Sequence, residues 1–106
     1  MMTTEQLIER AKECQTIADK ILKERDMKDY RARLETDKGK VRIVIEYYYV
    51  HPRFPQNYPW HFECDFIFHA DNKLEYWSCG STSWFYNFSV EQFEKLMRNA
   101  GNYVVV

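Results

Sequence analysis

Apolar residues recur every three to four positions between residues 4 and 28, and this spacing predicts a long amphipathic helix. The apolar stripe consists of Leu7, Ala11, Cys14, Ala18 and Ile21. Thr3 and Gln6 have the spacing of a capping box, so we expect the helix to begin there. The remaining face carries oppositely charged residues four positions apart, which favours a solvated surface.

Two strands are predicted next, over residues 30–36 and 41–50, with a glycine-containing turn at residues 37–40 between them. The second strand is apolar or aromatic at most positions, which is typical of a central strand covered on both faces. Residues 61–70 alternate between two faces. One face has Phe62, Cys64, Phe66 and Phe68, and the other has His61, Glu63, Asp65, Ile67 and His69.

A further strand is predicted over residues 74–79. We expect Gly80 and Ser81 to bend it and residues 82–88 to continue it, with Trp84, Tyr86 and Phe88 on one face. The last helix is predicted to follow Ser89, which forms a second capping box with Gln92.

These elements, joined by short connections, predict an α+β fold. It is an antiparallel sheet of four to five strands, with a long N-terminal helix packed on one face and a short C-terminal helix. The chain has 106 residues, no internal repeat and no linker. We therefore expect residues 1–106 to form a single domain.

The aromatic residues are concentrated in the middle of the chain, where fifteen of the eighteen lie between Tyr47 and Phe88. One small core is not expected to enclose so many rings, and Tyr and Trp favour binding surfaces. Residues 51–60 contain all three prolines and are predicted to form a loop. The candidate partner-binding residues are Tyr48, Phe54, Tyr58, Trp60 and Trp77. The alternative is that the loop folds back over the sheet and its rings form a second small core.

Charge argues against nucleic acid as a partner. Residues 41–106, the aromatic part, carry five Lys or Arg and seven Asp or Glu, whereas a face that stacks bases normally adds cations. The last predicted helix begins with the acidic stretch Ser89-Val90-Glu91, which excludes the lysine-rich start of a double-stranded-RNA-binding domain. No apolar run approaches the ~20 residues of a membrane span, so no membrane association is expected.

Cys14, Cys64 and Cys79 are three widely spaced cysteines without metal-binding spacing. We expect reduced thiols in a cytoplasmic protein, at least two of them in the core. Cys79 beside Gly80 is the candidate nucleophile of one alternative, a cysteine-dependent enzyme that uses Cys79 with His61 or His69. Those histidines are about 26 Å apart along an ideal strand at ~3.3 Å per residue, too far to share one ion. No metal or other cofactor is expected.

The leading functional prediction is a small non-catalytic protein-binding domain that uses an aromatic surface. Adaptor, immunity and inhibitor proteins are of this kind, and a phage or mobile-element inhibitor of a host defence system is one concrete form. A protein partner is expected, and a homodimer through an exposed sheet face or edge is also predicted. A second alternative is a small-ligand-binding domain with an aromatic pocket between helix and sheet.

Overall fold

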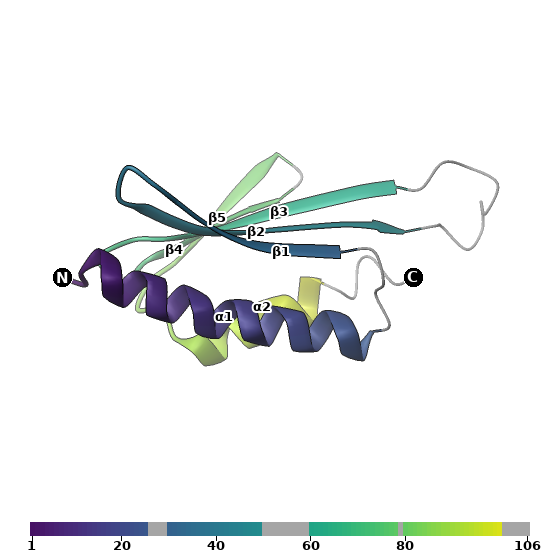
Figure 1. Ribbon diagram of the computed structural model, residues 1–106, viewed down its shortest axis with the longest axis horizontal. Coiled ribbons are helices and arrows are strands. Elements are labelled where there is room, and N and C mark those ends of the chain that lie inside the picture. The colour runs from purple at the N-terminus through teal and green to yellow at the C-terminus, as the bar shows by residue number, and fades with distance from the viewer. Residues whose placement is uncertain (26–29, 50–59, 79, 101–106) are drawn as a thin grey trace.

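The computed structural model describes residues 1–25, 30–49, 60–78 and 80–100, except for the side chains of residues 48, 49, 60–62 and 100. The elements in chain order are α1 (Thr4–Glu24), β1 (Tyr30–Asp37), β2 (Lys40–Tyr49), β3 (Trp60–Phe68), β4 (Leu74–Ser78), β5 (Ser81–Phe85) and α2 (Val90–Ala100). Figure 1 shows their arrangement, a sheet above two helices. The predicted α+β class is confirmed.

All five strands form one antiparallel sheet in sequence order, so β1 and β5 are its edges. The turn between β1 and β2 lies where it was predicted, and Asp37 pairs with Lys40 across it. Lys38 and Gly39 both have positive φ, at 50° and 80°. Positive φ at both central residues is what a two-residue type I′ hairpin turn requires.

The chain reverses near Gly80, so the expected continuation of one bent strand is wrong. Ser78 at the end of β4 pairs with Ser81 at the start of β5. Gly80 has a φ of 80°, a conformation that glycine adopts at little cost and other residues rarely adopt.

The strand after this reversal ends at Phe85, and Asn87 beyond it has a φ of 52°. The predicted common face of Trp84, Tyr86 and Phe88 is therefore also wrong. Phe88 is buried in the core, whereas the other two rings are exposed.

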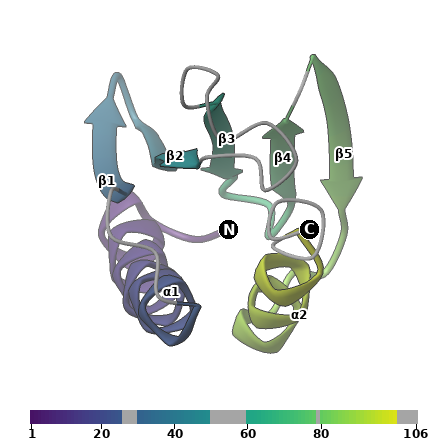
Figure 2. The same ribbon diagram turned by 90° about the vertical axis from the view of Figure 1, so that its right-hand side faces the viewer.

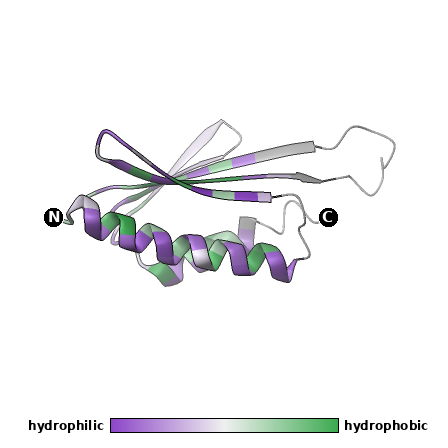
Figure 3. Ribbon diagram, in the orientation of Figure 1, coloured by the Kyte–Doolittle hydropathy of each residue, from purple (hydrophilic) through white to green (hydrophobic). Residues whose placement is uncertain are grey.

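Both helices lie on the same face of the sheet, with α1 below β1 and α2 below β4 and β5 (Figure 2). Hydrophobic and hydrophilic residues alternate along α1 (Figure 3), as the predicted amphipathic stripe requires. Ala11, Cys14 and Ala18 on that stripe are completely buried. Their small side chains allow the helix to lie close to the sheet. The strands contribute the larger core residues Val41, Ile43, Ile45, Tyr47, Cys64, Phe66, Phe68 and Leu74.

Both predicted capping boxes are present. The Thr3 N–H donates to Gln6 Oε1 at 2.9 Å, and the Gln6 N–H donates to Thr3 Oγ1 at 3.1 Å. Ser89 and Gln92 make the same pair of bonds at 2.9 and 3.3 Å. Each box satisfies two backbone donors that have no partner within the helix. The predicted extension of α1 to residue 28 differs, because the helix ends at Glu24.

The turn after β3, which contains Ala70 and Asn72, contacts the segments from which both helices begin. The Met2 N–H donates to the Ala70 carbonyl at 2.9 Å, and the Phe88 N–H donates to the Asn72 carbonyl at 3.0 Å. Arg10 of α1 donates to the Asn72 side chain, and its guanidinium lies 5.9 Å from the centre of the Phe88 ring. These contacts fix the starts of α1 and α2 against the same turn.

Candidate functional site

The candidate site lies on the face of the sheet that is opposite the helices, which we call the outer face. No element of the described part of the chain covers it (Figures 1 and 2). Because successive side chains of a strand point to opposite faces, its residues alternate with the core residues. Its described side chains are Arg31, Arg33, Glu35, Asp37, Lys40, Arg42, Val44, Glu46, Glu63, Asp65, Ile67, Glu75, Trp77, Thr82 and Trp84.

An ion-pair network covers the part of the outer face that belongs to β1 and β2. Arg33 lies 3.2 Å from Glu35 and also pairs with Glu46 across the strands. Arg42 lies 2.6 Å from Glu35 and 3.6 Å from Asp65 Oδ2. Among the described residues, this last, long contact connects the network to β3.

Val44 shows how completely that network covers the sheet. It lies on the outer face, where Arg33 and Asp65 are its direct cross-strand partners, yet its side chain is buried. The aliphatic stems of long charged side chains cover apolar surface in this way while their heads stay in water. The prediction that this strand is covered on both faces is confirmed at Val44.

The part of the outer face formed by β4 and β5 presents two tryptophans instead. Trp77 is 45% exposed and Trp84 is 46% exposed. Trp77 pairs with Thr82, and Trp84 pairs with Glu75, so the two indoles occupy diagonal positions on adjacent strands. Diagonal neighbours on one face lie about 7–8 Å apart between Cα atoms, within reach of aromatic side chains. We call Trp77 and Trp84 the aromatic patch.

His69 holds Trp84 in place and is itself held by Glu75. The His69 ring packs on Trp84 with centroids 5.1 Å apart, and His69 Nε2 lies 3.0 Å from Glu75 Oε1. Glu75 is the cross-strand partner of Trp84, so the three side chains form one cluster. The exposed indole thus has a defined position without being buried.

Asp65 borders the aromatic patch, because it is the direct cross-strand partner of Trp77. Its Oδ1 atom is buried and has no hydrogen-bond partner among the described residues. Burial raises the pKa of Asp65, and the nearby negative charge of Glu63 raises it further, while Arg42 lowers it. The arrangement leaves a carboxylate oxygen without a donor beside an exposed indole.

The predicted partner-binding residues divide into three groups. Trp77 is one of the two exposed tryptophans of the aromatic patch. Tyr48 and Trp60 belong to β2 and β3, but their side chains lie outside the described residues, as do Phe54 and Tyr58 entirely. The proposed role of these four residues therefore stays a prediction.

Trp84 was missed as a candidate by the sequence reasoning. A reversal of the chain between Ser78 and Ser81 would have signalled it, because these two residues then pair and Trp84 returns to the face of Trp77. Gly80 allows both a bend and a reversal, so the local sequence did not distinguish them.

The catalytic alternative lies largely outside the described residues, which exclude Cys79 and the side chain of His61. His69 is described, and it contacts Glu75 and Trp84. Among the described residues, no group of three or more His, Cys, Asp or Glu side chains could hold a metal ion.

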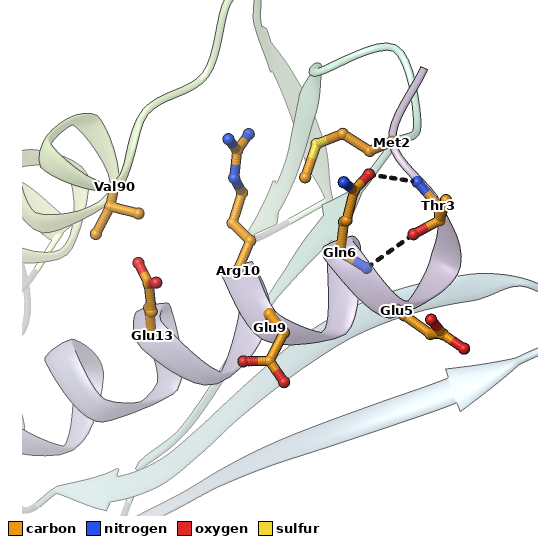
Figure 4. A pocket seen from close by; sticks show the side chains of 8 residues that line it. All are labelled: Met2, Thr3, Glu5, Gln6, Glu9, Arg10, Glu13 and Val90. Carbon is orange, nitrogen blue, oxygen red and sulfur yellow. Dashed lines mark hydrogen bonds between the residues drawn. The ribbon is translucent and has the colours of Figure 1, made fainter.

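A groove of about 490 Å³ lies beside the first turns of α1, next to the start of α2. Figure 4 shows Arg10 and Glu13 directed toward the side of Val90, whereas Glu5 and Glu9 project elsewhere. Its lining has no aromatic residue. It therefore differs from the aromatic pocket predicted as an alternative, and that alternative stays a prediction.

Comparisons with models of protein families, with curated proteins and with solved structures find no match for this chain. Neither helix, within the residues that the structure describes, combines the length and the apolar character that crossing a bilayer demands.

Proposed function

We propose that this chain is a non-catalytic protein-binding domain whose contact surface is the aromatic patch. The observation that carries the proposal is that Trp77 and Trp84 are diagonal neighbours on the outer face and each is nearly half exposed. Trp is enriched among the residues that contribute most to protein interfaces. Covering both indoles would remove on the order of 200 Å² of apolar surface from water, or about 5 kcal/mol before entropic costs.

The two edges of the sheet support an approach from the β5 side. β1 carries Arg31, Arg33, Glu35 and Asp37, whereas β5 has the uncharged sequence Ser-Thr-Ser-Trp-Phe. Figure 3 shows the difference as a hydrophilic β1 and a pale β5. Charged side chains on an edge strand oppose pairing with another chain. The uncharged edge beside the aromatic patch lacks this protection and gives a partner free access.

Adaptor, immunity and inhibitor proteins act through stoichiometric contacts of this kind. An inhibitor of a host defence system, carried by a phage or mobile element, remains the narrower form of the proposal. A second copy of the chain is another candidate partner, because two-fold dimers are the most common oligomers.

The experiment is capture of a partner by the tagged protein in its source cells, followed by calorimetry with that partner in purified form. The double variant Trp77→Ala/Trp84→Ala should bind roughly 100-fold more weakly, as expected for residues at the centre of an interface. Arg31→Ala, on the outer face at the opposite edge, is the matched control and should bind within about threefold of wild type. A folded double variant that binds with unchanged affinity would refute the proposal.

A further inference from the structure

The two halves of the outer face differ in the charges that they carry. The described charged side chains of the half formed by β1 and β2 are four cations and three carboxylates (Arg31, Arg33, Lys40 and Arg42; Glu35, Asp37 and Glu46). The ion pairs described there are internal, apart from the one between Arg42 and Asp65. The half formed by β3, β4 and β5 has the carboxylates Glu63, Asp65 and Glu75 among its described side chains, and no Lys or Arg. His69 contacts Glu75 there. The surface around the aromatic patch is therefore acidic.

Within this acidic half, the negative charge of Asp65 is only partly balanced by cations and hydrogen-bond donors. Among the described residues, the cation paired with Asp65 is Arg42, 3.6 Å from Oδ2, and Asp65 Oδ1 has no hydrogen-bond partner there. A buried carboxylate oxygen without a donor is costly, because it has lost its water without gaining a hydrogen bond. The Asp65 side chain as a whole is 17% exposed, and a donor from a second molecule would compensate the carboxylate there.

Trp77 adds a flat apolar surface next to this residue. Residues directly opposite each other in a sheet have Cβ atoms about 4.5–5.5 Å apart, and Trp77 and Asp65 are such a pair. Glu63 lies two residues along the same strand, on the same face, and its side chain is exposed. An indole face bordered by two carboxylates matches the chemistry of a guanidinium, which is planar, stacks on aromatic rings and donates in a fork.

We propose that the partner is a protein segment that presents an arginine to this surface, with its guanidinium stacked on Trp77 and hydrogen-bonded to Asp65 and Glu63. This inference rests on the proposed function, because it names the chemistry of the partner at the same patch. Arginine fits better than lysine, since the planar guanidinium stacks flat on the indole and donates in a rigid fork, whereas an ammonium group is a compact, strongly hydrated point charge. The attraction is electrostatic, so added salt weakens it.

The first test is an NMR titration with two peptides, acetyl-Thr-Arg-Thr-Arg-Thr-amide and its analogue with citrulline in place of each arginine. Citrulline keeps the shape of arginine and removes its charge. The arginine peptide should shift the Trp77 indole N–H signal saturably, and the citrulline peptide should not. Equal shifts with both peptides, or no saturable shift with the arginine peptide up to millimolar concentration, would overturn the inference.

Three variants locate the site. Asp65→Asn and, separately, Glu63→Gln should weaken binding of the arginine peptide roughly two- to fivefold, while Glu91→Gln on the exposed surface of α2 should leave it unchanged. Glu63 is exposed, so its variant keeps the test valid if Asp65→Asn disturbs folding. Unchanged binding in a folded Glu63→Gln or Asp65→Asn protein overturns the proposed contact with that carboxylate.

The captured partner separates this inference from the proposed function. If the double tryptophan variant loses the partner but the Asp65→Asn/Glu63→Gln variant retains it at all salt concentrations, the protein-binding function stands and the arginine contact is wrong. If the double tryptophan variant retains the partner, the proposed function itself is wrong. A second copy of the chain as the sole occupant of the patch would likewise overturn the arginine contact.

Discussion

Phe66 on β3 and Phe93 on α2 pack edge to face, with ring centroids 4.8 Å apart, and both side chains are completely buried. Phe66 also lies 4.9 Å from the ring of Tyr76 on β4. Edge-to-face pairs of this kind contribute about 0.5–1.5 kcal/mol beyond the burial of their area. The contact connects the C-terminal helix to the centre of the sheet, directly below the strands that carry the aromatic patch.

Replacing Phe93 with Ala should lower the free energy of unfolding by about 3–5 kcal/mol, because it leaves a cavity beside Phe66. Urea unfolding followed by circular dichroism measures the loss. Phe93→Leu keeps most of the volume and should cost clearly less, which makes it the matched control. A loss below about 1 kcal/mol in the alanine variant would show that α2 does not depend on this contact.

The double variant Trp77→Ala/Trp84→Ala should lose no more than about 1–2 kcal/mol of stability, because both rings are already half exposed. Part of the loss comes from the contact between Trp84 and His69. Thermal unfolding of the variant beside wild type measures it. A much larger loss would mean that the indoles support the fold, and the binding test would then need single substitutions.

The pKa of Asp65 should lie above the ordinary aspartate value of ~3.9, because of burial and the neighbouring Glu63. NMR titration of the side-chain carboxyl carbon measures it directly. Glu63→Gln should lower this pKa by removing a negative charge, and Arg42→Gln should raise it by removing a positive one. A midpoint at or below the ordinary value would contradict the described environment.

The raised pKa of Asp65 also determines how the contribution of this residue to the free energy of unfolding changes with pH. The folded state binds the Asp65 proton more tightly than the unfolded state, so this contribution is complete below the ordinary pKa. It is lost as pH rises through the raised, folded pKa. The stability of wild type relative to Asp65→Asn should therefore fall as pH rises through that window. Urea unfolding of both proteins across the acidic pH range tests this sign.

Cys14 should resist alkylation in the native protein. Its side chain is completely buried, and burial, with a smaller effect of Glu13, raises its pKa to about 12. At pH 8 only about one thiol in ten thousand would be ionised, and the thiolate is the reactive form. Peptide mapping after iodoacetamide treatment should find Cys14 modified only when urea is present. Rapid modification without urea would show that α1 opens readily from the sheet.

The local sequence determined the elements whose signals are short-range. Both capping boxes, the turn at Lys38 and Gly39 and the alternation of β3 depend on residues within a few positions of one another, and each was predicted correctly. Periodicity also identified which side of α1 would be buried. These features follow from backbone geometry and hydrogen bonding that nearby residues decide.

Only the tertiary structure decided which aromatic rings remain exposed. The sequence placed Trp84 with Phe88, but the reversal at Gly80 and the positive φ of Asn87 separate them, because pairing with β4 outweighs the local alternation. The polar side of β3 was expected from the sequence. The sequence did not predict that Asp65 would have an unpartnered oxygen or lie opposite Trp77. Both features depend on which side chains of β2 and β4 face Asp65. Such cross-strand relationships arise from strand register, and register depends on the burial of the whole sheet face against the helices.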